Sequence, residues 1–217
     1  MNDAHAYVEL NERPLGGHAM LLALVPDGTR VLDVGCSSGY LARRLVESGC
    51  TVVGIELDER AAAAARNLCA EVLVGDAERM ELPFAPRSFD VVLCGDLVEH
   101  LRDPQRFLER VRPLLREGGR LVLTTPNVAN WTMRLGLLFG RWRYTKRGIL
   151  DRTHSHLFTR KTLVETLSAA GYRVVRLDFT APVPLIGRPT IERAAHAVAR
   201  ARPSLFAYQF VVAATPA

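Results

Sequence analysis

The sequence lacks the features that would place the chain in a membrane or in an oxidising compartment. No apolar run approaches the roughly 18 to 20 residues that a helix needs to span a bilayer. The first residues show no basic region followed by an apolar run, so we expect no secretory signal. The four cysteines form no C-x-x-C pair and lie in or beside apolar segments, which favours buried, reduced thiols. We therefore predict a cytoplasmic protein with no stable membrane insertion.

The charge of the sequence is only mildly unbalanced. Lysine and arginine number 28 against 23 aspartates and glutamates, which gives a net charge of +5. On a domain of 217 residues, such a surplus is more often a solvated surface than the sign of an anionic partner. The hydrophobic content of 48% and the charged content of 24% are globular averages, which exclude wholesale disorder.

Short apolar runs alternate with helical segments along the first 126 residues. The runs are apolar throughout instead of alternating with polar residues, which is typical of parallel strands covered by helices on both faces. We predict strands at residues 30–34, 51–56, 71–75, 89–94 and 120–124, and helices at 40–48, 58–68 and 103–115.

Two further strands are predicted later in the chain, at 172–180 and 205–213, on either side of a basic helix around 191–200. Because they follow five strand–helix units, we expect them to form an antiparallel hairpin at a sheet edge. The predicted fold class is α/β. It is a doubly wound, mostly parallel seven-stranded sheet with helices on both faces, an antiparallel edge hairpin and a cap insertion.

We expect a single domain over residues 1–217, with a lead-in at 1–28, a ligand-binding core at 29–126, and a C-terminal helix and edge strands at 159–217. Between them, residues 127–158 break the alternation for more than 30 positions. Long connections of this kind are often functional, so we expect this insertion to cap the ligand site. The insertion contains Trp131, Trp142 and Tyr144 together with Arg134, Arg141, Arg143, Lys146 and Arg147.

A glycine turn follows the first predicted strand. In a doubly wound fold this turn lies at the carboxyl edge of the sheet, where ligands bind. Gly35 and Gly39 allow the backbone to approach a ligand closely and to adopt angles that other residues avoid. Their spacing is G-x-x-x-G, which argues against a dinucleotide and hence a nicotinamide oxidoreductase, because a pyrophosphate requires G-x-G-x-x-G.

The segment Asp33-Val34-Gly35-Cys36-Ser37-Ser38-Gly39 resembles the first motif, acidic-x-G-x-G-x-G, of the Rossmann-like S-adenosylmethionine-dependent methyltransferases. The resemblance is to the small-molecule branch that includes the ubiquinone-pathway methyltransferases. Ser37 stands where the family has its middle glycine. The resemblance covers roughly residues 29 to 125 and extends more loosely over the rest. It implies S-adenosyl-L-methionine as cofactor and methyl transfer as the activity.

By this resemblance, acidic residues at the ends of successive strands hold the cofactor. Glu56 would hold both ribose hydroxyls, since a carboxylate accepts two hydrogen bonds at once. Asp76 would meet the adenine amino group, and Asp33 would orient the methionine part through its amino group or nearby backbone. Any one acid alone would be structural, but the three with the glycine turn favour the cofactor. The remaining expected cofactor positions are Gly35, Cys36 and Gly39 in the turn, Leu57 and Ala77 beside the adenine, and Gly95 and Asp96 along the methionine part.

Three histidines are the candidate catalytic residues, because a general base helps when the methyl acceptor is a hydroxyl. His100 follows the fourth strand, and a packing role at a helix start is an equally good interpretation of it. His154 and His156 lie in a polar segment, residues 151–159, that is similar to Asp-x-Thr-His-x-x-x-Phe-Thr segments of the wider family. In the alternative interpretation, this segment only ties the insertion to the core. We favour that structural role for Asp151 and a functional role for His154.

A divalent metal is a further possibility that the resemblance raises. Some ubiquinone-pathway relatives bind one through a carboxylate-x-x-Glu-His segment, and Asp96, Glu99 and His100 fit this spacing. However, Glu-His at this point is widespread among relatives that need no metal. We therefore predict no metal site.

The predicted function is methyl transfer to an oxygen or nitrogen of a small-molecule acceptor. The basic, aromatic insertion keeps a nucleic-acid or protein methyltransferase open as an alternative. No Asn-Pro-Pro-Tyr or Asp-Pro-Pro-Tyr segment follows the fourth strand, as in enzymes that methylate bases, so we do not favour nucleic acid as a partner. The amphipathic run at 131–139 would form a lid or touch a membrane surface. A non-catalytic cofactor-binding module is the third alternative. The sequence leaves the oligomeric state open.

Overall fold

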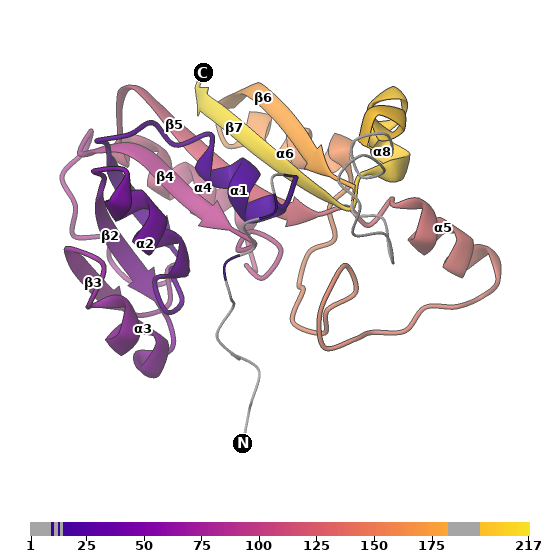
Figure 1. The fold of residues 1–217 in the computed structure, drawn as a ribbon, viewed down its shortest axis with the longest axis horizontal. Coiled ribbons are helices and arrows are strands. Elements are labelled where there is room, and N and C mark those ends of the chain that lie inside the picture. The colour runs from indigo at the N-terminus through magenta and orange to yellow at the C-terminus, as the bar shows by residue number, and fades with distance from the viewer. Residues whose placement is uncertain (1–9, 11–12, 14, 182–195) are drawn as a thin grey trace.

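The computed structural model describes residues 10, 13, 15–181 and 196–217. They form one mixed seven-stranded sheet with the strand order β3-β2-β1-β4-β5-β7-β6 (Figure 1). This confirms the predicted fold class. The strands are β1 (Arg30–Val34), β2 (Thr51–Glu56), β3 (Glu71–Val74), β4 (Phe89–Gly95), β5 (Leu115–Pro126), β6 (Tyr172–Thr180) and β7 (Gln209–Pro216).

Two layers of helix cover the sheet, as Figure 1 shows. The alternation of side chains along each strand separates two cores: Leu32 and Val34 of β1 join one cluster, and Val31 joins the other. The first layer is α1 (Gly17–Leu22), α2 (Tyr40–Glu47) and α3 (Glu59–Ala65). The second is α4 (Pro104–Val111) and α6 (Arg160–Ala169).

The carboxyl ends of the parallel strands β1, β2, β3 and β4 meet at one edge of the sheet. β1 pairs in parallel with both β2 and β4, and β2 pairs in parallel with β3. The four cysteines are buried and unbridged, as expected. Among the described residues, no helix is both long enough and apolar enough to cross a membrane. The parallel pairing of these strands brings the turns after β1, β2, β3 and β4 side by side.

The last two strands form the predicted antiparallel edge, but the second begins later than predicted. β7 starts at Gln209 and lies between β5 and β6, antiparallel to both. The expected start at residue 205 is wrong, because Pro203 begins a short helix, α8 (Pro203–Phe206), and its fixed φ suits the first helical turn. Part of the basic helix expected around 191–200 lies outside the described residues, and residues 196–201 are helical.

Two other element boundaries differ from the prediction for local reasons. The helix expected to reach residue 115 ends at Val111, and Arg112–Leu114 form a 3-10 turn. Pro113 lies in this turn, and a proline cannot continue an α-helix. The strand after it begins at Leu115 instead of residue 120, with an irregular register against β4 between Phe89 and Val91.

The insertion, residues 127–158, leaves the sheet and returns to the same place. Asn127 forms an isolated bridge with Phe158, and the Val128 N–H donates to the Phe158 carbonyl oxygen at 2.9 Å. Within the insertion, α5 (Trp131–Leu138) has no buried residue, and Figure 1 shows it extending beyond the sheet. Both ends of the insertion are thus fixed at the carboxyl end of β5.

Candidate functional site

The turn after β1 has a left-handed backbone at three positions. The φ angles are +75° at Gly35, +49° at Ser37 and +79° at Gly39. At Gly39 the space for a side chain is also tight, because a Cβ would lie 3.2 Å from the Ala65 Cα. The φ angle favours glycine at this position, and the close approach of α3 adds to the preference.

Glu56, at the end of β2, holds this turn through its side chain. Its Oε2 accepts a hydrogen bond from the Ser37 N–H at 2.8 Å. Its Oε1 accepts from the N–H groups of Leu57 at 2.8 Å and Asp58 at 2.9 Å. Since each carboxylate oxygen can accept two hydrogen bonds, capacity remains on Oε2. This fits a ribose hydroxyl at the expected position.

Asp33, the penultimate residue of β1, lies beneath the turn with 1% of its surface exposed. Its Oδ2 has no hydrogen-bond partner among the described residues. Burial raises the pKa of Asp33 to about 7, and the negative charge of Glu56 adds to the rise. A buried carboxyl without a partner is unfavourable, and a cationic donor would relieve this. The amino group of a methionine moiety is such a donor, so the residues present fit S-adenosyl-L-methionine.

Gly95 and Asp96 lie where β4 ends. Asp96 has a φ angle of +50°. Its Oδ1 accepts hydrogen bonds from the Thr124 hydroxyl, at 2.9 Å, and from Gln209 Nε2. A Cβ at Gly95 would lie 3.3 Å from Leu41 Cδ1, so this position is also tightly packed. Sequence reasoning did not identify Thr124 and Gln209, which hold Asp96 from β5 and β7.

The expected adenine positions lie around the ends of β2 and β3. Leu57 is 68% exposed, and an aromatic ring would cover it. Asp76 and Ala77 are half-buried, and Asp76 Oδ1 accepts a hydrogen bond from the Glu78 N–H at 2.9 Å. Cys36 is different, since its thiol is buried toward Gly54, where a Cβ would lie 2.6 Å from the sulfur. Only the Cys36 backbone is therefore available to a ligand.

One residue near this site was not proposed from the sequence. His18 of α1 is half-buried, and its ring lies 5.1 Å from the ring of Tyr40. Burial lowers the pKa of His18, and the charge of Asp96 opposes this shift. The placement of His18 follows from α1 packing over the strand ends, which no sequence motif indicates.

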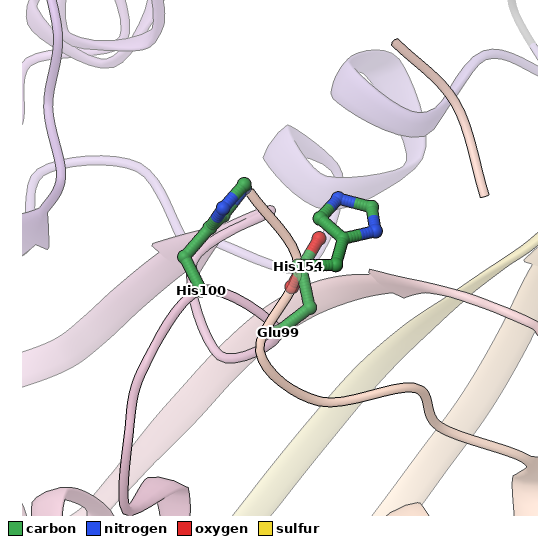
Figure 2. A group of neighbouring side chains, drawn as sticks. All are labelled: Glu99, His100 and His154. Atoms are coloured by element: carbon green, nitrogen blue, oxygen red, sulfur yellow. The ribbon is translucent and has the colours of Figure 1, made fainter. Parts of the chain in front are cut away.

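His100 and His154 come together with Glu99 beyond the end of β4 (Figure 2). One ligand atom from each of the three lies within 4.8 Å of the others. Glu99 and His100 belong to the loop after β4, whereas His154 belongs to the segment that returns from the insertion (Figure 2). The rings of the two histidines are 4.8 Å apart, edge to face. We refer to Glu99, His100 and His154 as the histidine–glutamate cluster.

The protonation states of the cluster are shifted by burial. Burial raises the pKa of Glu99 well above its ordinary value, and the charge of Asp96 adds to this. The Thr125 hydroxyl lies close enough to offset part of the rise. Burial also lowers the pKa of His100, with His154 adding to the effect. Both groups are therefore biased toward their neutral forms.

His156 does not join this cluster. Its Nδ1 lies 2.9 Å from the Leu101 carbonyl oxygen, and its ring stacks on Phe158 at 6.2 Å. The N–H groups of Ser155 and His156 donate to the Glu99 carbonyl oxygen at 2.8 and 2.9 Å. Asp151 Oδ1 accepts from the N–H and hydroxyl of Thr153 within its own turn. The segment 151–156 thus ties the insertion to the loop after β4, while His154 also points into the cluster.

Comparison with known proteins also leads to the methyltransferases. The family described as a methyltransferase domain matches residues 9–177. Among similar curated proteins is a ubiquinone biosynthesis O-methyltransferase from Coxiella burnetii, 33% identical over 113 residues, or 46% of this chain and 44% of that protein. Another from Paracidovorax citrulli is 34% identical over 125 residues, or 55% of this chain and 52% of that protein. The chain spans about half the length of these relatives.

Solved structures share the fold at low identity. An S-adenosylmethionine-dependent methyltransferase from Mesorhizobium loti has a TM-score of 0.61 at 20% identity, covering 89% of this chain and 94% of that one. One from Archaeoglobus fulgidus has a TM-score of 0.63 at 21% identity, covering 85% of each chain.

These matches and the site together define a Rossmann-like, S-adenosylmethionine-dependent methyltransferase fold. The chain belongs to the methyltransferase-domain family, and the cofactor implied is S-adenosyl-L-methionine. The resemblance seen in the sequence is confirmed.

The buried Asp33 and the half-buried Glu56 give a first prediction. Asp33→Ala and Glu56→Ala should each weaken the binding of S-adenosylhomocysteine by roughly tenfold or more, because hydrogen bonds to charged groups contribute ~1.5–3 kcal/mol. Titration calorimetry measures this directly. Glu59→Ala removes an exposed acid one turn away that pairs with Arg66, and it serves as the control. Unchanged affinity in both site variants would sink the assignment of these residues.

Asp33 also gives a prediction about pH. Its pKa of about 7 in the folded chain exceeds the ordinary 3.8, so the folded chain binds more protons between these values. The stability contributed by this group is complete below the unfolded pKa and is lost as the pH rises through the folded pKa. Between about pH 5 and 8, the free energy of unfolding of the ligand-free chain should fall relative to that of Asp33→Asn. Denaturant titrations of both proteins test this, and parallel curves would contradict it.

Proposed function

We propose that this chain transfers a methyl group from S-adenosyl-L-methionine to an oxygen or nitrogen of a small-molecule acceptor. The observation that carries the proposal is the buried Asp33, whose Oδ2 has no partner among the described residues, beneath the left-handed turn that Glu56 holds. On one side, Asp33 needs a cationic group to pair with its buried carboxylate. On the other side, Glu56 can accept a further hydrogen bond from a ligand hydroxyl. Both needs are met by one molecule that carries an amino acid and a ribose.

The cofactor supplies an activated methyl group on its sulfonium when bound. The chain's own residues then have to align the acceptor and exclude water, and alignment alone contributes several kcal/mol to the lowering of the barrier. Asp33, Glu56 and Asp76 would fix the cofactor from three successive strand ends. The insertion at 127–158 would cap the acceptor side.

The histidine–glutamate cluster is placed to act on the acceptor. It lies beside Asp96, at the end of the strand next to β1, and one of its members comes from the insertion. His154 Nδ1 is 3.1 Å from the Ile149 carbonyl oxygen, and His100 Nδ1 is 3.2 Å from the Thr153 carbonyl oxygen. Because a carbonyl only accepts, each Nδ1 carries the proton and each Nε2 keeps its lone pair. Either Nε2 is then free to take a proton from an acceptor hydroxyl or to bind a cation.

The acceptor class is supported by the curated relatives named for ubiquinone biosynthesis, which match about half of the chain. A nucleic-acid or protein acceptor remains the second candidate because of one observation. Trp131, Leu138 and Tyr144 of the insertion are 46%, 77% and 51% exposed, and arginines stand among them. Exposed aromatic and basic side chains suit a macromolecular partner.

An assay with separated acceptor pools tests the proposed function. The chain would be incubated with methyl-labelled S-adenosylmethionine and, separately, a filtered small-molecule extract, total RNA and a protein fraction. We expect label in the small-molecule pool, and no label with Glu56→Ala. Label in RNA or protein instead would favour the second candidate. If S-adenosylhomocysteine binds but no pool is labelled, the chain is a cofactor-binding module and the proposal is wrong.

His154 gives a more local prediction. His154→Ala should lower the turnover number by roughly 100-fold, the typical contribution of a positioned acid–base group, because it removes a group that faces the acceptor. The affinity for S-adenosylhomocysteine should stay within about twofold, since His154 lies outside the expected cofactor positions. Steady-state kinetics and calorimetry on the same preparation separate the two quantities. Normal turnover would remove His154 from the reaction.

A further inference from the structure

We propose that Glu99, His100 and His154 form a binding site for one divalent transition-metal ion of the zinc type. This goes beyond the proposed function, because the site is defined by the side chains themselves and binding requires no methyl donor. The prediction of no metal was based on relatives that carry Glu-His at this point and need no metal, whereas the structure adds a ligand from a distant segment.

The three side chains already stand close to a metal-binding arrangement (Figure 2). One ligand atom from each lies within 4.8 Å of the others. Around a zinc ion bound at about 2.0 to 2.2 Å, neighbouring nitrogen and oxygen ligands are roughly 3.3 Å apart. Small side-chain rotations therefore suffice to bring the three ligands onto one ion.

Among the described residues, the carboxylate of the cluster is buried without a hydrogen bond to either of its oxygens, although the Thr125 hydroxyl lies near it. Glu99 is 1% exposed, and neither Oε1 nor Oε2 has a hydrogen-bond partner in the part of the chain that the structure describes. A buried polar group in this condition destabilises a fold unless something pairs with it. A cation between the carboxylate and the imidazoles would supply that partner.

The two imidazoles are held as metal-ligating histidines are. In metal sites the second ring nitrogen of a ligating histidine typically donates to a backbone carbonyl or carboxylate, which fixes the tautomer and the ring orientation. Here the Nδ1 atoms of His100 and His154 face the carbonyl oxygens of Thr153 and Ile149 at 3.2 and 3.1 Å. Both rings therefore present Nε2 as the atom that can ligate.

The ligand set and its surroundings select the class of ion. Two imidazoles and one carboxylate suit zinc, iron or other transition ions, whereas magnesium and calcium prefer oxygen ligands. Asp96 is not counted as a ligand, since it is not in the group whose ligand atoms lie within 4.8 Å of one another, and its Oδ1 accepts hydrogen bonds from Thr124 and Gln209. Asp96 and Asp151 nevertheless lie close enough to His100 to act on it electrostatically, so the site is in a field that favours a cation.

Binding at this site would connect two parts of the fold. Glu99 and His100 belong to the loop after β4, and His154 belongs to the returning end of the insertion. Three protein ligands leave a coordination position open, as in catalytic zinc sites. A bound ion could then polarise an acceptor hydroxyl as a Lewis acid, and this last step alone depends on the proposed function.

The test uses the tag-free chain after dialysis against a chelator. Calorimetry with Zn²⁺ and visible absorption with Co²⁺ are measured for the wild type, Glu99→Gln, His154→Ala and His156→Ala, with Mg²⁺ as a comparison ion. We expect one Zn²⁺ per chain, a higher melting temperature with Zn²⁺, and little response to Mg²⁺. Glu99→Gln and His154→Ala should each weaken Zn²⁺ binding by roughly tenfold or more, as loss of a ligand or its support does in metal sites. His156→Ala is the matched control, because its ring faces Leu101 and lies outside the cluster.

Two outcomes would overturn the site. One is the absence of Zn²⁺ binding by a wild-type chain that is folded by circular dichroism. The other is equal Zn²⁺ affinity in His154→Ala, His156→Ala and the wild type, which would show binding elsewhere. Zn²⁺ binding by a chain that labels no acceptor pool still supports the site, so its test is separate from that of the proposed function.

Discussion

The carboxylate of Glu56 is the constraint on which the cofactor side of the molecule depends. It satisfies three backbone N–H groups, from Ser37, Leu57 and Asp58, that belong to two different turns. The N–H groups of Gly35 and Cys36 still bond to the Ile55 carbonyl oxygen of β2, but at Ser37, where φ is +49°, the N–H needs a side-chain partner. Because Glu56 ends the neighbouring parallel strand, the register of β1 and β2 sets the distance between carboxylate and turn. The same register leaves Asp33 buried below the turn with an acceptor atom unused, so the shape of the site and its charge have one origin.

Much of this half of the molecule could be predicted because the determinants are local. β1 and β2 match their predicted bounds, since each is an apolar run flanked by polar residues and each ends at an acid or a glycine turn. The placement of Asp33 and Glu56 at one edge could be predicted for the same reason, because the carboxyl ends of neighbouring parallel strands share that edge. The support of Asp96 could not be found this way. It joins β4 to Gln209, 113 positions along the chain, and this contact depends on β7 lying between β5 and β6.

The histidine–glutamate cluster was partly visible in the sequence. The spacing of Asp96, Glu99 and His100 indicated a ligand set on one loop, but a spacing does not show which side chains the fold directs elsewhere. Thr124 and Gln209 bind the Asp96 carboxylate, while the returning segment of the insertion brings in His154. Backbone hydrogen bonds from Ser155 and His156 to the Glu99 carbonyl oxygen fix that segment in place. In the folded chain, His154 therefore takes the place in the cluster that the spacing along the sequence indicated for Asp96.

The two ends of the insertion meet at one point, where Asn127 pairs with Phe158 and the side-chain amides of Asn127 and Asn130 donate to the Ala207 carbonyl oxygen at 2.9 and 2.8 Å. A segment closed at its base in this way behaves as a module: its length and composition can change while the strands beneath keep their register. Lengthening it adds little to the entropy of closing the loop, which grows only logarithmically with the number of residues. One core can in this way carry insertions of different length and composition, and transplanting residues 127–158 between relatives would test whether this segment selects the acceptor.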